Sequence, residues 1–330
     1  MAGNGMIGTP PCKTLKITFA CTCRLLQTSE VVLMNPVAKI LGALRAIARH
    51  PINHRRKLMA VLEYGFIQTA ARLVPGDICV EFPNHTYLLV SPRMKGAAHY
   101  IAPRLCEFEE MAFVMHFLRP GELFVDVGAN VGAFTILAAG VAGAGVRAFE
   151  PNPGTFEMLE RNVRLNGLQA RVNPVCAAVG QSEGTIQLTT DFGTENYVTT
   201  GATAKNSVTV KMIALDKELS EATPDLMKVD TEGFETGVFS GATNLLRRPQ
   251  LRAMIVERSN NGVRYGFDEA VLHLQIRQCG FIPCRYDPFA RRLSRVENEA
   301  LGNIIYVRDI PGTDAVLRAA PAFKLGDLSV

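Results

Sequence analysis

The sequence predicts an α/β fold with a mostly parallel sheet and helices on both faces. Three observations support this prediction. Short apolar runs alternate with amphipathic helical segments along most of the 330 residues. Glycine turns join several of these runs to the helix that follows. Carboxylates stand at the ends of successive runs, which is the edge where open α/β sheets bind ligands.

The stretch GELFVDVGANVGAF is the clearest of these strand–turn–helix units. Its run Leu123–Val127 is typical of a parallel strand that is buried on both faces. Asp126 interrupts the run close to its carboxyl end. Gly128 and Gly132 bracket Asn130, so the chain can turn tightly and bring backbone N–H groups close to a ligand before the helix begins.

The glycine pattern indicates which kind of nucleotide suits this turn. The dinucleotide fingerprint G-x-G-x-x-G requires glycine where this chain has Asn130, and the Asn side chain would crowd a pyrophosphate. Glu150 ends the next run, where a carboxylate holds ribose hydroxyls in nucleoside-binding folds. We therefore expect a nucleoside ligand without a pyrophosphate, most commonly S-adenosylmethionine, and not NAD.

Accessory segments are expected before the sheet. Residues 1–33 lack periodicity and are expected to form a disordered tail, unless Met34 is the true first residue. Residues 34–106 are expected to hold a helical hairpin, with helices from Asn35 to about His50 and from about His54 to Leu73, and then a β-hairpin between Asp77 and Pro92.

The apolar side of the second of these helices needs a partner. Leu58, Val61, Leu62, Phe66 and Ile67 recur on one side of it. We expect this side to pack on protein, either on the sheet domain or on a second subunit of a homo-oligomer. Membrane association is the alternative.

Charge is distributed unevenly along the chain. The formal net charge is +4, but residues 1–75 hold ten Lys or Arg against two Asp or Glu, a balance of +8 that leaves −4 for the remainder. Such an arm is most often simply solvated, and weak peripheral contact with an anionic membrane is the alternative. We expect no nucleic-acid partner, and no integral membrane segment because no apolar run reaches about 20 residues.

The eight cysteines form no C-x-x-C pair and have no histidine at the spacing of a zinc ligand. They are expected to be free, buried thiols, which indicates a reducing environment and a cytoplasmic location. We therefore expect neither a disulfide framework nor a metal site.

The remaining elements of the sheet follow in chain order. Parallel strands are expected at Val146–Glu150, Arg171–Val179, Pro224–Val229 and Leu251–Val256, and a closing antiparallel pair at Phe281–Tyr286 and Asn303–Val307. Helices are expected from Asn152 to Leu165 and from Phe234 to Leu246. An antiparallel excursion, Gly184–Thr189 with Ser207–Ile213, encloses a polar loop, Asp191–Asn206, where we expect substrate contacts.

Three motifs in this region resemble those of a known family. FVDVGANVG, FEPNP and KVDTEGFE are similar, in order and spacing, to the motifs of the FkbM family of S-adenosylmethionine-dependent methyltransferases. The resemblance implies a class I, Rossmann-like methyltransferase fold with a seven-stranded sheet. It places the methyltransferase domain at residues 107–310, with 311–330 as a C-terminal extension.

The resemblance also implies residues that bind the cofactor S-adenosylmethionine. Asp126 would contact its methionine end, the turn that contains Gly128, Asn130 and Gly132 would pass beneath it, Glu150 would hold the ribose, and Ala178 and Val179 would line the adenine. His99, Tyr100, Glu107 and Glu109 are candidates for a cap over the cofactor.

The implied reaction is O-methylation of a hydroxyl on a sugar, polyketide, glycan or other small molecule. Asp230 and Glu232 are the candidate catalytic residues, as base or as positioning groups, although Glu232 could instead cap the helix that follows. N-methylation of a small molecule and a non-catalytic nucleoside-binding protein are the alternatives. No metal is expected here either, and a Mg²⁺ ion held by oxygen ligands at the strand ends is the alternative.

Overall fold

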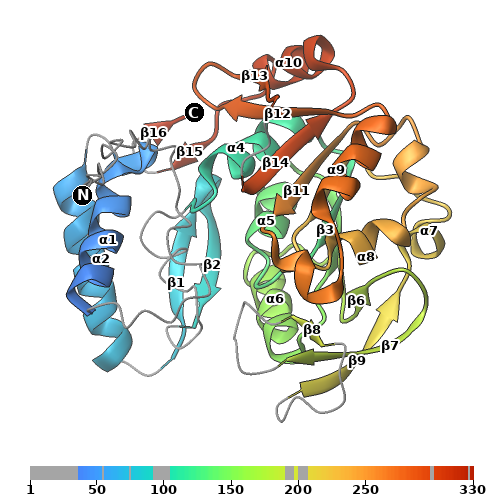
Figure 1. Ribbon diagram of the computed structural model, residues 1–330. Helices are drawn as coiled ribbons and strands as arrows, with labels where there is room; N and C mark the ends of the chain where they lie inside the picture. The colour runs from blue at the N-terminus through green and yellow to red at the C-terminus, as the bar shows by residue number, and fades with distance from the viewer. Residues whose placement is uncertain are drawn as a thin grey trace, which may run out of the picture.

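The computed structural model describes residues 36–53, 56–73, 76–91, 105–189, 197–199, 207–297, 301–325 and 328–330. At its centre lies an eight-stranded sheet with helices on both faces (Figure 1). The predicted α/β fold is confirmed.

The central sheet has the strand order β13-β12-β14-β11-β10-β3-β4-β5. The five strands from β11 to β5 are parallel, and β14, β12 and β13 join through antiparallel pairs. The parallel strands are β3 (Leu123–Val127), β4 (Gly145–Phe149), β5 (Val172–Val175), β10 (Leu226–Val229) and β11 (Ala253–Arg258). The others are β12 (Ile282–Asp287), β13 (Arg292–Arg295) and β14 (Gly302–Val307).

Strand β13 makes the sheet one strand wider than expected. It forms a hairpin with β12 because the side chain of Asp287 accepts hydrogen bonds from the backbone N–H groups of Phe289 and Ala290 and closes the turn.

The order of the strands creates a switch point between β3 and β10. From β3 the chain adds β4 and β5 on one side, and it later adds β10 and β11 on the other. The carboxyl ends of these five parallel strands lie along one edge of the sheet. Ligands of open α/β folds bind outside this edge, at the switch point.

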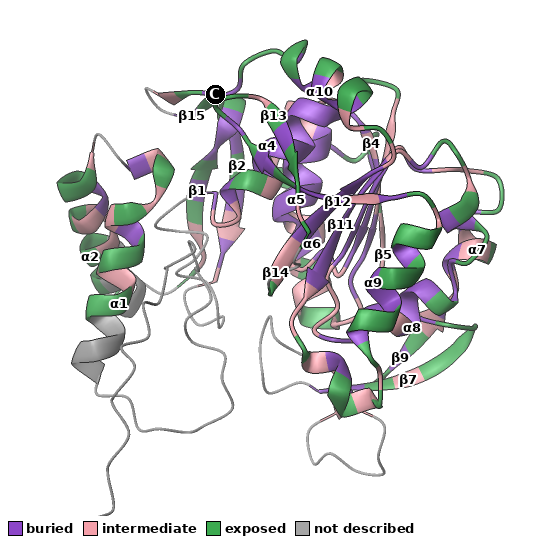
Figure 2. Ribbon diagram, turned by 45° about the horizontal axis from the view of Figure 1, so that its top comes forward, coloured by how far each residue is buried: buried purple, intermediate pink, exposed green. Residues whose placement is uncertain are grey.

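Helices cover the two faces of the sheet and bury separate core clusters (Figure 2). One face carries α4 (Phe108–Phe117), α5 (Ala133–Ile136), α6 (Pro153–Leu165) and α10 (Ile310–Arg318). The other carries α7 (Leu215–Glu218), α8 (Glu235–Ser240) and α9 (Glu269–Gln278). Helix α4 is buried on almost every side, which explains its lack of a polar face.

The expected third strand is broken. Strand β5 ends at Val175, and the chain then moves into a second, four-stranded sheet of order β6-β9-β7-β8. Its strands are β6 (Ala178–Val179), β7 (Gly184–Thr189), β8 (Val198–Thr199) and β9 (Ser207–Ile213). The antiparallel pairing of β7 with β9 is confirmed, whereas nearly all of the polar loop between them lies outside the described residues.

The helix expected from Phe234 to Leu246 stops at Ser240. The cause is Asp216, whose carboxylate accepts hydrogen bonds from the N–H groups of Asn244 and Leu245 and so starts a separate 3-10 turn, Leu245–Arg247.

The N-terminal helical hairpin is present. Helices α1 (Pro36–Arg49) and α2 (Lys57–Leu73) pack through Ile47 and Ala60. The hairpin docks on the sheet domain through its turn, where the ring of His50 lies 5.9 Å from that of Phe108. The expected packing of the apolar side of α2 on this domain is wrong: Leu58, Leu62 and Phe66 are exposed.

Two short hairpins complete the fold, β1 (Ile78–Phe82) with β2 (Thr86–Val90), as expected, and β15 (Lys324–Leu325) with β16 (Leu328–Ser329). Phe323, Leu325 and Val330 join the same core cluster as α4. The C-terminal residues therefore pack into the sheet domain.

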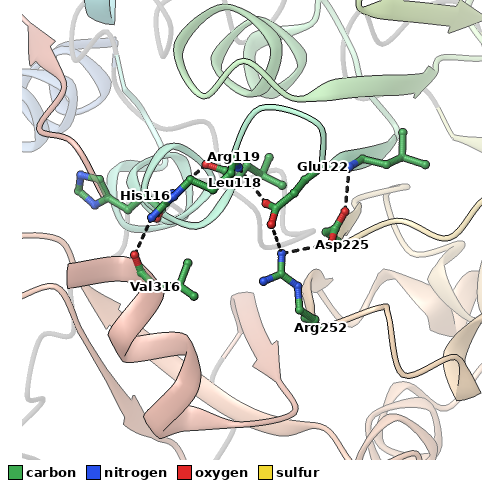
Figure 3. A network of polar contacts seen from close by, with 8 residues as sticks. His116, Leu118, Arg119, Glu122, Asp225, Arg252 and Val316 are labelled. Atoms are coloured by element: carbon green, nitrogen blue, oxygen red, sulfur yellow. Dashed lines mark hydrogen bonds and ion pairs between the residues drawn. The ribbon is translucent and has the colours of Figure 1, made fainter. Parts of the chain in front are cut away.

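The opposite edge of the sheet, where the parallel strands begin, is held by a polar network (Figure 3). Arg252 donates to Glu122 over 2.6 Å and to Asp225 over 3.2 Å, while Asp225 accepts the N–H of Leu123. The guanidinium also lies 4.7 Å from the ring centre of Phe117. These charges satisfy one another and join the starts of β3, β10 and β11, so their role is structural.

The cysteines of the described residues are free, but only Cys284 is fully buried. The expectation of burial is wrong for Cys79, which points outward on β1, and for Cys176, which lies in the turn where the chain leaves the central sheet. Within the described ranges, none of the helices combines the length and apolar character needed to cross a bilayer.

Candidate active site

Charged side chains gather on one face of the sheet at the switch point. Lys228 on β10 pairs in register with Asp126 on β3. Because strand side chains alternate, both lie on the same face as Phe124 and Leu226, which belong to the core beneath α4 to α6. Asp230 follows Lys228 by two residues and bonds to it. These charges therefore lie between the sheet and the helices, at its ligand-binding edge.

The turn after β3 has the conformation that its glycines predict. Gly128, Asn130 and Gly132 have φ values of 79°, 55° and 92°. A Cβ atom on Gly128 would lie 1.9 Å from the carbonyl oxygen of Asp230, so this turn and the one after β10 are in backbone contact. Asn130 supports its own conformation, because its side-chain oxygen accepts the N–H of Val131.

Glu150 closes this turn from the neighbouring strand. Its carboxylate is buried and accepts the N–H of Asn130 over 2.9 Å and that of Asn152 over 2.8 Å. Burial raises the pKa of Glu150 to about 7, against the opposing effect of these two N–H groups. Each oxygen keeps a further lone pair, so Glu150 can accept hydrogen bonds from hydroxyls of a ligand.

Asp126 is almost fully buried beside this turn. Its Oδ2 accepts a hydrogen bond from the hydroxyl of Thr135 over 2.7 Å. Its Oδ1 is buried and has no hydrogen-bond partner within the described part of the chain. Burial raises the pKa of Asp126, and the nearby charge of Lys228 opposes this effect. A buried acceptor of this kind suits a donor supplied by a ligand.

Lys228 is a site residue that the sequence analysis missed. Its ammonium group lies 2.8 Å from Oδ2 of Asp230 and 4.7 Å from the ring centre of Phe134. Burial lowers its pKa, but the carboxylates of Asp230, Glu107 and Asp126 outweigh this and raise it above the usual value. The signal in the sequence was a lysine inside a buried strand, which is rare unless the charge is paired.

The turn after β10 is stabilised by Glu235. Glu235 accepts the N–H groups of Thr231 and Gly233 over 2.8 and 3.2 Å. Burial raises the pKa of its carboxyl group. Glu232 is half-buried and has a φ of 55°, a conformation that non-glycine residues rarely adopt away from functional sites. Glu235 thus holds the turn that precedes α8, and α8 itself begins without a side-chain cap among the described residues.

The other candidates lie in different places. Glu107 accepts a hydrogen bond from Asn303 over 2.6 Å and is close enough to Lys228 to raise its pKa. Glu109 lies near Arg285 and Asp287 of β12. His99 and Tyr100 lie outside the described residues.

Ala178 and Val179 are buried in β6, within the second sheet. Their contact with an adenine ring stays a prediction.

The residues at the switch point fit S-adenosylmethionine. Oδ1 of Asp126, which has no hydrogen-bond partner among the described residues, suits a cationic donor. Glu150 suits two ribose hydroxyls, and the glycine turn offers bare backbone between them. Within the described residues, no three His, Cys, Asp or Glu side chains come together as metal ligands.

The fold is that of a class I, Rossmann-like methyltransferase. Residues 126–283 match the family model described as the methyltransferase FkbM domain. The resemblance to the FkbM family that the three motifs indicated is thus confirmed.

Two relatives share part of the sequence. Hexuronic acid methyltransferase AglP of Haloferax volcanii is 35% identical over 130 residues, which are 37% of this chain and 50% of that protein. A tRNA (guanine(37)-N(1))-methyltransferase of Puccinia graminis f. sp. tritici is 42% identical over 73 residues, or 22% of this chain and 14% of that protein. The chain thus spans half or less of the length of these relatives.

Among solved structures, methyltransferase FkbM from Methylobacillus flagellatus KT is similar with a TM-score of 0.40 and 13% identity, over 82% of this chain and 59% of that one.

Proposed function

We propose that the protein transfers a methyl group from S-adenosylmethionine to a hydroxyl oxygen of a sugar, a glycan or another small molecule. The observation that carries this proposal is the group of charged side chains at the switch point, above all the buried Oδ1 of Asp126 beside the glycine turn, which accepts no hydrogen bond from the described residues. The relative that methylates hexuronic acid supports a sugar as the acceptor.

The residues of the site divide into two groups. Asp126, the turn from Gly128 to Gly132 and Glu150 bind the cofactor, which supplies an activated methyl group. Asp230 lies on the other side of the switch point, at the end of β10. It accepts the hydrogen bond of the acceptor hydroxyl and takes up its proton as the oxygen–methyl bond forms.

Lys228 fixes the orientation of Asp230. The ion pair of 2.8 Å is buried on the lysine side, where only 4% of the side chain is exposed, while 20% of the Asp230 side chain remains accessible. Lys228 therefore holds Asp230 in place while part of the Asp230 side chain remains accessible to the acceptor. Glu232 follows in a strained turn and is a second candidate for contact with the acceptor.

The proposal is tested with S-adenosylmethionine that carries an isotope-labelled methyl group. The purified protein is incubated with free hexuronic acids, neutral sugars and simple amines, and the products are analysed by mass spectrometry and NMR. Label in an O-methyl group on a sugar is expected. Label found solely on nitrogen would contradict the oxygen acceptor, and no transfer to a sugar under conditions where the cofactor binds would contradict the sugar.

A further inference from the structure

Helix α2 is apolar on two opposite sides. Its inner side packs on α1 through Ala60, with Val61 and Tyr64 beside it. On the other side Leu58, Leu62, Phe66 and Leu73 are exposed by 72%, 56%, 75% and 76%. Their spacing of four, four and seven residues places them in one row along the helix. We call these four residues the outer stripe.

Among the described residues, the outer stripe takes no part in the hydrophobic core clusters. The hairpin contacts the sheet domain at its turn, where His50 lies against Phe108 and Ile52 packs on the core cluster. Figure 1 shows α1 and α2 at the edge of the molecule, beyond the β1–β2 hairpin, and Figure 2 shows exposed residues along α2. An exposed row of large apolar side chains usually marks a surface that binds a partner.

Charge indicates the nature of that partner. Residues 36–73 contain seven Lys or Arg and one acidic residue, Glu63, a net charge of +6, although the whole chain carries only +4. Arg45, Arg49 and Lys57 are exposed near the turn of the hairpin. Arg56 is paired with Glu63. The positive charge is thus concentrated on the same hairpin that carries the outer stripe, and it complements an anionic surface.

We propose that the α1–α2 hairpin binds reversibly to the surface of an anionic lipid bilayer. The outer stripe enters the boundary between headgroups and acyl chains, while the basic residues remain among the anionic headgroups. Basic residues near such a surface are attracted to it by its negative charge. The combination of an apolar row with clustered basic residues is the pattern of helices that lie in this boundary.

A second copy of the chain fits the outer stripe less well. A stable protein interface takes about 20 or more residues from each partner, whereas the stripe has four. Two hairpins that each carry a charge of +6 would also repel one another. A lipid surface avoids both difficulties, because binding to it requires no complementary protein surface and its charge is opposite to that of the hairpin.

The experiment measures sedimentation of the full-length protein with vesicles of phosphatidylcholine, with and without phosphatidylserine. The test variant is Leu62→Ser with Phe66→Ser. The control is Val271→Ser with Leu274→Ser, which removes two similarly exposed apolar side chains from α9. Circular dichroism and binding of S-adenosylhomocysteine show that each variant keeps its fold.

We expect the wild type and the control variant to bind the anionic vesicles and not the neutral ones. Added salt should release both proteins from the anionic vesicles. The test variant should bind about tenfold or more weakly, because it removes two of the four apolar side chains that would leave water on binding. Absence of wild-type binding, or equal binding by the test variant, would overturn the proposal. So would a stable dimer in solution that the same two substitutions dissociate, because the stripe would then bind a second copy.

Discussion

Replacing Glu150 by Gln removes the buried charge at the proposed ribose site and keeps the shape of the side chain. The folded protein raises the pKa of this carboxyl group from 4.5 to about 7. Each unit of pKa corresponds to about 1.4 kcal/mol, so ionised Glu150 costs the folded state about 3 kcal/mol at pH 7. Such a cost in an otherwise stable turn is expected of a group that is kept for ligand binding.

The sign of the pH dependence follows from the direction of this shift. Below pH 4.5 the carboxyl group is protonated in both the folded and the unfolded chain. Between pH 4.5 and 7 the unfolded chain loses the proton first, so the wild type loses about 1.4 kcal/mol of unfolding free energy per pH unit relative to Glu150→Gln. Above pH 7 the difference in unfolding free energy between the wild type and Glu150→Gln should be constant.

Urea denaturation of both proteins over this pH range measures the difference in their unfolding free energies. Groups that titrate in the same way in both proteins do not contribute to this difference. In the Glu150→Gln variant, the new side-chain amide places its NH₂ group against a backbone N–H, which costs about 1 to 3 kcal/mol at every pH and leaves the slope unchanged. Parallel curves for the two proteins would refute the reasoning, because they would mean that Glu150 is not desolvated.

The same variant should bind the cofactor more weakly. Loss of charge-assisted hydrogen bonds to two hydroxyls costs about 1.5 to 3 kcal/mol, or tenfold to a hundredfold in affinity. Wild-type affinity for S-adenosylhomocysteine should rise about tenfold from pH 6 to pH 8 as Glu150 ionises, and the variant should lack this rise. Calorimetric titration measures both effects, and unchanged affinity in the folded variant would mean that the ribose is held elsewhere.

Three further variants test the other parts of the site. Asp230→Asn should lower single-turnover rates about 100-fold and leave the dissociation constant of the cofactor nearly unchanged; an equal loss of both would assign Asp230 to cofactor binding. Lys228→Met should reduce the unfolding free energy by about 3 to 5 kcal/mol, measured in urea, because it leaves Asp126 and Asp230 without their cation; wild-type stability would contradict the buried ion pair. Gly128→Ala should destabilise the fold by about 2 kcal/mol or more and weaken cofactor binding, because its Cβ would meet the carbonyl oxygen of Asp230. Gly76→Ala, also at positive φ but with open space around it, is the matched control.

Local patterns in the sequence predicted the parallel strands and the turn after β3. A run such as Leu123–Val127 has few alternatives to a buried strand, and Gly128 and Gly132 specify a positive φ by themselves. The helix capped by Asn152 was predicted for the same reason, since its side chain accepts the N–H groups of Gly154 and Thr155 within the local sequence.

Contacts between distant segments were not predictable in this way. Lys228 meets Asp126 only through the register of β10 on β3. The motif KVDTEGFE contains several acidic residues, and spacing alone did not show that Glu235 folds back on the turn. For α2 the periodicity identified the apolar positions, but it did not show that the hairpin would dock by its turn and leave the outer stripe exposed.

The central claim is that the edge between β3 and β10 binds S-adenosylmethionine through the glycine turn and Glu150. Calorimetric titration of the purified protein with S-adenosylmethionine, S-adenosylhomocysteine and NAD tests it most directly. We predict that S-adenosylmethionine and S-adenosylhomocysteine bind the same single site and compete with one another. NAD should give no signal, because Asn130 occupies the position where a pyrophosphate site requires glycine. Binding of NAD without any binding of S-adenosylmethionine or S-adenosylhomocysteine would contradict the claim.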